Sequence, residues 1–287
     1  MISTHSLTRY QMANSSQILE HILQTPPSSP NPILYQFLVP NAKGMDNLLS
    51  TYASSLSSTA NAPPTPSSSS HPEIEVSIFT AATETFAQKN TNCSIAESLE
   101  RFKPVFQKSK ENNLRVRAYI SVALGCPYEG PDVDPKKVAD LAVNLLEMGA
   151  DEISVADTTG MGTAPRTREL LRTLAAAGIE SSDMALHFHD TFGQALVNTV
   201  VGLEAGVRTF DAAVAGLGGC PYSPGATGNV ASEDMVYLFE SLGLRTGVDL
   251  VRLAEVGEWI AAEVGKPSES RAGKATLARL RRGDAKL

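Results

Sequence analysis

Met184-Ala-Leu-His-Phe-His-Asp190 is the stretch of sequence that decides the fold of this chain. Its apolar run ends in two histidines, and a helical pattern over residues 191–206 follows directly. Short apolar runs that alternate with helices are typical of parallel sheets covered by helices. Residues i and i+2 of a strand point to the same face, so His187 and His189 are expected to project together.

The same strand–helix pattern repeats along most of the chain. From residue 74 onward five strand–helix units follow one another, and an earlier candidate strand lies upstream. Such repetition predicts an α/β fold with a parallel sheet, and both a doubly wound sheet and a (β/α)8 barrel fit it. A complete barrel needs eight strands. Six are predicted, at residues 33–38, 74–79, 114–120, 152–155, 184–189 and 207–214.

Two predicted helices carry clear start signals. Ser94 and Glu97 form a capping box ahead of one helix. Asp134 is the predicted N-cap of another, with Pro135 at its first helical position. These signals support helices between the predicted strands.

Three segments of the chain depart from the repeating strand–helix pattern. Residues 1–32 form a divergent segment with one predicted helix, residues 15–24. Residues 50–72 are rich in Ser, Pro, Thr and Ala, so a disordered insertion is expected there. The barrel-like domain is expected to span residues 33–265, and residues 266–287 are expected to form a C-terminal tail.

Composition and charge exclude several classes of partner. The formal net charge is −7 and no long basic run occurs, which argues against nucleic acid and anionic membranes. Three cysteines without a C-x-x-C pair argue against a disulfide framework. No apolar run is long enough for a transmembrane helix. The chain ends in Ala285-Lys-Leu287, which is close to a peroxisomal address, so a peroxisomal or cytoplasmic location is expected.

The histidine pair at the end of its strand is a candidate metal site. One alternative is structural, with one imidazole lining the core and the other bonded to a neighbouring backbone group. Zinc sites usually recruit further His or Cys close by, whereas the remaining nearby donors here are oxygens. The donor set therefore favours Mg²⁺ or Mn²⁺.

Two other candidate residues follow predicted strands. Asp157 ends a strand and enters a glycine-rich turn, where turn chemistry is as good an explanation as catalysis. Cys220 lies in Gly216-Leu-Gly-Gly-Cys-Pro-Tyr222, a loop whose glycines allow close approach to a ligand. Cys126 occurs in a similar loop, and Cys93 is expected to be structural because it directly precedes a helix N-cap.

At these residues the sequence resembles the 3-hydroxy-3-methylglutaryl-CoA lyase family, within the metal-dependent aldolase and lyase barrels. The resemblance covers roughly residues 33–265 apart from the Ser/Pro stretch, and its Gly-Gly-Cys-Pro-Tyr loop argues against related synthases and aldolases. The matching segments are Lys89-Asn-Thr-Asn-Cys-Ser94, Ala123-Leu-Gly-Cys-Pro-Tyr-Glu-Gly130, the Asp157 turn, His187-Phe-His-Asp-Thr-Phe-Gly-Gln194 and the Cys220 loop through Asn229.

The resemblance implies an activity and roles for individual residues. The implied reaction is metal-dependent cleavage of the acyl-CoA to acetyl-CoA and acetoacetate, chemistry of leucine catabolism, carried out by a homodimer. Asp157 is the preferred proton acceptor, because a metal-bound histidine cannot take a proton through the same nitrogen. The implied metal ligands are His187, His189 and Asn229, the implied catalytic residues are Cys220, Asp157 and His187, and the implied substrate-binding residues are Asn90 and Arg117.

One departure from the family pattern leaves an alternative open. The resemblance implies an early Arg-Asp-Gly strand that supplies an arginine and an aspartate ligand, and a second early strand that supplies a glutamate. This chain contains no Arg-Asp-Gly. We therefore expect an incomplete (β/α)8 barrel that lacks its first two strands. The chain is then either an N-terminally shortened lyase or a catalytically impaired paralogue, such as a pseudoenzyme or partner subunit in a specialised pathway.

Overall fold

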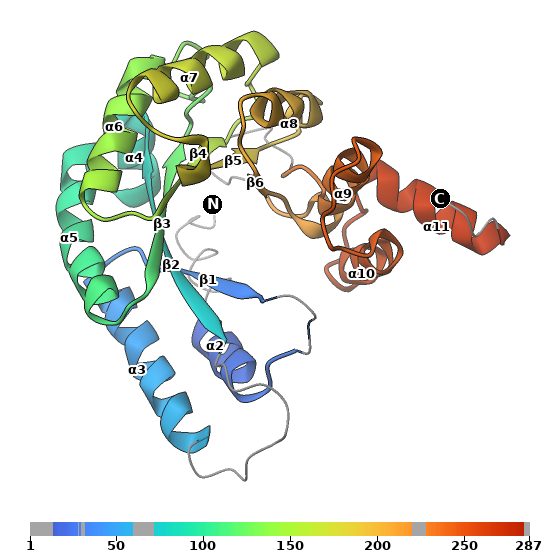
Figure 1. The fold of residues 1–287 in the computed structure, drawn as a ribbon, viewed down its shortest axis with the longest axis horizontal. Helices are drawn as coiled ribbons and strands as arrows, with labels where there is room; N and C mark the ends of the chain where they lie inside the picture. The colour runs from blue at the N-terminus through green and yellow to red at the C-terminus, as the bar shows by residue number, and fades with distance from the viewer. Residues whose placement is uncertain (1–13, 28, 30–31, 60–71, 220–227, 284–287) are drawn as a thin grey trace, which may run out of the picture.

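The computed structural model describes residues 14–27, 29, 32–59, 72–219 and 228–283. One parallel sheet forms the centre of the molecule, and its strands lie in sequence order, β1-β2-β3-β4-β5-β6 (Figure 1). This order and the curl of the sheet agree with a partial barrel and not with a doubly wound sheet. The strands are β1 Leu34–Leu38, β2 Glu73–Ala81, β3 Arg115–Ser121, β4 Glu152–Asp157, β5 Met184–Phe188 and β6 Thr209–Asp211.

The helices between the strands cover the outer face of this sheet, and the last three helices lie beyond β6 (Figure 1). The helices are α2 Ser15–Gln24, α3 Ala42–Thr59, α4 Glu84–Thr91, α5 Ile95–Glu111, α6 Pro135–Glu147, α7 Ala164–Ala176, α8 Ala195–Glu204, α9 Ser232–Ser241, α10 Leu250–Glu263 and α11 Arg271–Arg282. Two short 3₁₀ turns are η1 Ser181–Asp183 and η2 Val214–Gly216.

The predicted helix start signals are confirmed. The Ser94 side chain accepts a hydrogen bond from the backbone of Glu97, whose carboxylate accepts one from the backbone of Ser94. Asp134 accepts a hydrogen bond from the backbone of Lys136 at the start of α6. Each cap satisfies backbone N–H groups that the first helical turn leaves unpaired.

The two faces of the sheet differ in polarity. The outer face is apolar and packs on the helices through fully buried residues such as Ile78, Ile120 and Ile153. On the inner face, Glu75 and Ser154 are buried polar residues. Parallel strands normally bury apolar residues on both faces. The polar inner face therefore marks the side of the sheet that carries chemistry.

The sheet is open within the described residues. β1 pairs only with β2 and β6 pairs only with β5, so each has one unpaired edge in this part of the chain. The expectation of an incomplete barrel is confirmed. The ends of the sheet therefore expose backbone groups that a closed barrel would pair.

The Ser/Pro-rich stretch differs from the expectation in part. Helix α3 extends to Thr59, so the prediction of disorder is wrong for residues 50–59. The helix persists because Met45 and Leu48 are buried in the core and α3 packs against α2. Residues 60–71 lie outside the described part.

The C-terminal tail is largely helical. Helix α11 packs against α10 and α9 and is capped by the Ser270 side chain, which accepts a hydrogen bond from the backbone of Gly273. Residues 285–287, which carry the peroxisome-like ending, lie outside the described residues. None of the helices that the structure describes is long and apolar enough to cross a membrane.

The capping box of α5 gives a test of this local structure. We expect Ser94→Ala to lower the free energy of unfolding by about 1 kcal/mol, because the first turn loses its side-chain acceptor. Urea unfolding followed by circular dichroism measures this. The control is Ser54→Ala, whose hydroxyl bonds the carbonyl of Ser50 within α3. Equal losses in both variants would contradict the capping role.

Candidate functional site

The two histidines of the opening motif lie together at the carboxyl end of β5. Their ring centroids are 5.3 Å apart, with an interplanar angle of 49°. His187 is the more accessible, with a side chain that is 24% exposed, whereas His189 is buried. The expectation that the two imidazoles project together is confirmed.

His189 is held as a neutral imidazole. Burial, together with the nearby imidazole of His187, lowers the pKa of His189 to about 4. Its Nδ1 is buried and has no hydrogen-bond partner in the described part of the chain. A neutral imidazole with free lone-pair capacity suits metal ligation.

Asn229 faces His189 from the segment that follows the cysteine loop. The two residues form an isolated antiparallel bridge, and bridged residues present their side chains to the same side. The Asn229 Nδ2 donates a hydrogen bond to the carbonyl of Leu217 at 2.9 Å. The side-chain oxygen of Asn229 is therefore left available as a metal ligand.

The Leu217 contact also fixes the base of the cysteine loop. Leu217 and Asn229 come from the two ends of that loop, so both ends meet beside His189. Gly218 has a φ of 101°, and a side chain at this position would meet the Asn229 Nδ2 at 2.8 Å. Glycine is thus required for this close approach. Cys220 itself lies outside the described residues.

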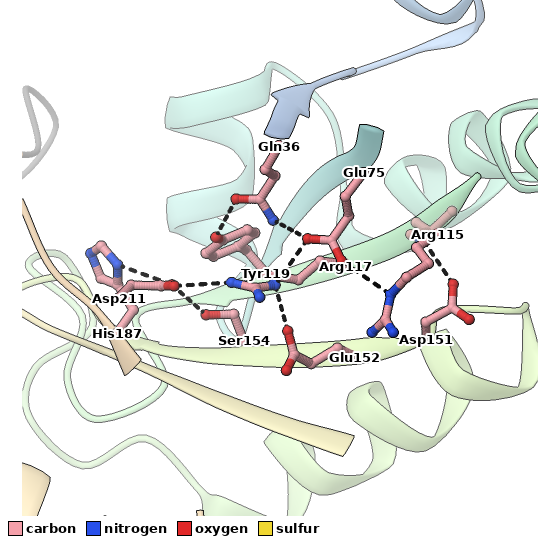
Figure 2. Close-up of polar contacts among 11 residues, drawn as sticks. Gln36, Glu75, Arg115, Arg117, Tyr119, Asp151, Glu152, Ser154, His187 and Asp211 are labelled. Atoms are coloured by element: carbon pink, nitrogen blue, oxygen red, sulfur yellow. Dashed lines mark hydrogen bonds and ion pairs between the residues drawn. The ribbon is translucent and has the colours of Figure 1, made fainter. Parts of the chain in front are cut away.

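A network of hydrogen bonds and ion pairs links His187 to polar residues on the inner face of the sheet (Figure 2). The Nδ1 of His187 is 3.5 Å from the Oδ2 of Asp211, the last residue of β6. Asp211 also accepts hydrogen bonds of 3.0 Å from Arg117 Nη1 and from Ser154 Oγ. Burial favours the protonated acid, yet His187, Arg117 and Ser154 together lower the pKa of Asp211 below its ordinary value. Asp211 is therefore ionised at neutral pH.

Arg117 is the centre of this network. Its guanidinium also contacts Glu152 and Glu75, and only 15% of its side chain is exposed. Although burial opposes its charge, Asp211 and Glu152 raise the pKa of Arg117 further. Arg117 was predicted to bind substrate; in the structure its guanidinium is occupied by protein carboxylates.

The network continues toward β1. Gln36 donates to Glu75 at 2.9 Å and accepts from the hydroxyl of Tyr119 at 2.9 Å. Burial and the charge of Asp211 raise the pKa of Tyr119 to about 12, so it stays a neutral phenol. Hydrogen bonds and ion pairs therefore link residues of β1, β2, β3, β4 and β6 across the inner face of the sheet.

The backbone carbonyl of Asp157 accepts a hydrogen bond from the backbone of His189 at 3.2 Å, but its side chain does not share the face of the imidazoles. In the register it pairs with Phe188, whereas His187 pairs with Ala156, so its side chain leaves the opposite face of the sheet. Its Oδ2 accepts a hydrogen bond from the backbone of Gly162 at 2.9 Å. Burial raises the pKa of Asp157 to about 6, although these hydrogen bonds oppose the shift. The structure places this carboxylate on the turn after β4 and does not bring it to His187.

The remaining candidate residues also lie outside the network. Asn90 is half-buried near the end of α4. Cys126 is fully buried and its sulfur accepts a hydrogen bond from the Thr83 hydroxyl at 3.2 Å. Cys93 is buried beside the N-cap of α5. Both described cysteines are therefore structural.

The donors at this site fit a divalent cation. Two imidazoles and an amide oxygen come from neighbouring positions, and the Nδ1 atoms of both imidazoles are buried without a hydrogen-bond partner in the described part of the chain. In the described part of the chain, no group of three His, Cys, Asp or Glu side chains could hold a metal. The candidate metal ligands found here, two imidazoles and an amide oxygen, are all neutral. Mg²⁺ prefers octahedral coordination, so coordination positions remain for water and substrate oxygens.

Sequence reasoning missed the residues that support His187. Asp211, Tyr119 and Glu152 were not singled out, although each is a polar residue on a predicted strand. Arg115, Arg117 and Tyr119 alternate with apolar residues along β3, and this period of two is the signal that could have placed them on one face.

Comparisons with known proteins agree with this arrangement. The model of the HMGL-like family matches residues 69–260. A Pseudomonas aeruginosa protein named 3-hydroxy-3-isohexenylglutaryl-CoA/hydroxy-methylglutaryl-CoA lyase is 45% identical over 269 residues, which cover 94% of this chain and 81% of that protein. The mitochondrial hydroxymethylglutaryl-CoA lyase of rat is 43% identical, over 93% of this chain and 74% of the rat protein.

Solved structures give the same result. The crystal structure of hydroxymethylglutaryl-CoA lyase from Pseudomonas aeruginosa superposes with a TM-score of 0.81 and 44% identity, over 94% of this chain and 81% of that one. An HMG-CoA lyase from Acinetobacter baumannii, solved with coenzyme A and 3-methylmalate, superposes with a TM-score of 0.75 and 28% identity, over 89% and 76% of the two chains.

The buried carboxylate of Asp157 predicts a pH-dependent change in stability. An acid whose pKa is raised by folding destabilises the fold above that pKa, and the cost is lost as pH falls from about 6 toward the ordinary 3.8. At most about 3 kcal/mol is involved. We expect Asp157→Asn to raise Tm by several degrees at pH 8 and to change it little at pH 4.5, as measured by calorimetry.

Asp132→Asn is the matched control, because Asp132 is exposed. Its Tm should stay within about 1 °C of the wild type at both pH values. A lower Tm for Asp157→Asn at pH 8 would show that the hydrogen bonds of the carboxylate outweigh its burial.

Proposed function

This chain belongs to the HMGL-like family, and on that premise we propose that it is a divalent-metal-dependent carbon–carbon lyase. Its proposed reaction is cleavage of 3-hydroxy-3-methylglutaryl-CoA to acetyl-CoA and acetoacetate. The observation that carries the proposal is the meeting of His187, His189 and Asn229 at the carboxyl end of β5, beside the base of the Cys220 loop. Barrels of this kind hold their active sites at that end.

We propose that His187, His189 and Asn229 hold the cation, as Mg²⁺ or Mn²⁺. When bound, the cation would polarise and orient the hydroxyl and a neighbouring oxygen of the substrate. The low pKa of His189 keeps that imidazole neutral near neutral pH, with one ring nitrogen free to act as a ligand.

The bond changes are those of a retro-Claisen cleavage. The C3 hydroxyl loses its proton, and the electron pair of that bond forms the ketone of acetoacetate. The adjacent carbon–carbon bond breaks, its electrons move to the acetyl-CoA carbon, and that carbon takes up a proton. The protein must therefore accept one proton and deliver one.

We assign the proton transfers to the Cys220 thiol. An imidazole nitrogen that holds a cation cannot also take a proton, so His187 contributes as a ligand. Asp157 leaves the other face of β4, so we propose that it fixes the turn after that strand through Gly162. As a thiolate, Cys220 can take the hydroxyl proton and return it to the departing carbon, which balances the reaction.

The partners and location follow the same family. An acyl-CoA substrate is supported by the coenzyme A bound in the Acinetobacter baumannii structure. The relatives include a mitochondrial protein of rat and a cytoplasmic one of zebrafish. We propose a homodimer in the peroxisome or cytoplasm, the peroxisome being favoured by the Ala285-Lys-Leu287 ending.

The neutral donor set has a consequence for activity. The proposed ligands in the described part of the chain, two imidazoles and an amide, leave the charge of a divalent cation uncompensated. Cation binding by this chain should therefore be weaker than in a site with a carboxylate.

The activity test uses the full chain with Mn²⁺ and 3-hydroxy-3-methylglutaryl-CoA. We expect Mn²⁺-dependent release of acetoacetate, and we expect His189→Ala to lower kcat/KM at least about 100-fold because a buried ligand is lost. A coupled assay of acetoacetate measures the rate.

The control variant is His21→Ala, which removes an exposed imidazole from α2. It should keep the wild-type rate. The proposal is overturned if the folded chain with Mn²⁺ releases no acetoacetate, or if His189→Ala keeps full activity.

A further inference from the structure

We propose that Asp211 is a positioning residue that fixes the orientation and tautomer of His187, and that Arg117 and Ser154 hold Asp211 in place. The inference rests on the proposed function in one respect, namely that His187 is a ligand of the cation. It adds residues to the site that sequence reasoning did not single out.

Strand register puts the acid beside the imidazole. His187 on β5 pairs directly with Asp211 on β6. Directly paired residues present their side chains to the same face of the sheet. The 3.5 Å contact between His187 Nδ1 and Asp211 Oδ2 is therefore set by the backbone pairing of the two strands.

The carboxylate of Asp211 is restrained on its other sides. Arg117 donates to Oδ1 and Ser154 donates to Oδ2, each at 3.0 Å. Both donors come from the strands on the far side of β5, so the acid is drawn across the inner face toward the imidazole (Figure 2). Only 17% of the Asp211 side chain is exposed, which limits competition from water.

This arrangement selects one tautomer of His187. The 3.5 Å contact is an ion-pair contact and is too long for a hydrogen bond in this structure. A carboxylate accepts hydrogen bonds and cannot donate, so its charge favours the proton on the neighbouring Nδ1. The proton-free nitrogen is then Nε2, which is left as the donor to a cation. Carboxylates that hold the second nitrogen of a ligating histidine fix its ring and raise its basicity.

The two imidazoles are therefore unequal. The Nδ1 of His187 has a carboxylate within ion-pair distance but makes no hydrogen bond within the described residues, whereas the Nδ1 of His189 has neither an ion pair nor a hydrogen bond there. Arg117 is shared by Asp211, Glu152 and Glu75, so it offsets only part of the charge of Asp211. The network therefore orients His187 and not His189.

The first test reads the tautomer without metal. The chain has five histidines, so ¹⁵N-histidine NMR can assign the ring nitrogens, with His187→Ala identifying the signal. We expect the proton of His187 on Nδ1 in the wild type and a shift toward Nε2 in Asp211→Asn. A wild-type His187 that carries its proton on Nε2 would overturn the inference.

The second test measures Mn²⁺ affinity by calorimetry. Asp211→Asn should weaken binding by about 10- to 100-fold. Added to His187→Ala, the same change should cost less than about threefold, because the imidazole that Asp211 orients is gone. Asp132→Asn is the control, since Asp132 is an exposed acid outside the network; it should change the affinity less than about threefold.

Ser154→Ala keeps the inference testable if Asp211→Asn fails to fold. It removes one hydrogen bond to Asp211 and should weaken Mn²⁺ binding measurably while the thermal melt remains cooperative. If the wild type binds Mn²⁺ and the folded Asp211→Asn or Ser154→Ala variant binds it with unchanged affinity, the inference is overturned and the proposed function is not. No Mn²⁺ binding by the folded wild type overturns the proposed function as well.

Discussion

The pairing of β5 with β6 is the constraint on which the rest of the site depends. It is short, with His187 opposite Asp211 at its carboxyl end. A slip of one residue would turn Asp211 toward the helices and leave His187 without its carboxylate. The segment after β6 then returns to β5, where Asn229 bridges His189, so one strand end carries all three proposed cation donors.

The inner face of the sheet is polar, and its buried acids are grouped around one guanidinium. Arg117 lies between Glu75, Glu152 and Asp211, and each acid would be costly to bury alone. Removing one partner of such a group leaves an uncompensated buried charge. The network therefore stabilises a curled sheet whose edges at β1 and β6 are open within the described residues. It also holds His187 in place through Asp211.

Much of the fold could be predicted because local pattern determines it. The helix at residues 15–24 and the capping box at Ser94 need no knowledge of distant contacts. The last strand was predicted too long, since the chain bends into η2 with Ala215 at a φ of 58°. Residues 50–59 were predicted disordered because composition does not reveal that α3 packs on α2.

The site was predictable only within one strand. His187 and His189 share a face because they stand two residues apart, and this needs no register. Asp211 and Asp157 come from other strands, so their faces depend on register that the sequence does not contain. Asp211 was therefore missed although it lies at the imidazole. The proton-transfer role of Asp157 stays a prediction, and the register places its side chain on the face opposite to His187.

Pulsed electron paramagnetic resonance of the Mn²⁺-loaded chain tests the central claim most directly. Two imidazole ¹⁴N couplings are predicted for the wild type, and one should disappear in His187→Ala and one in His189→Ala. A spectrum with no nitrogen coupling, or one that neither variant changes, would show that the paired imidazoles do not hold the cation.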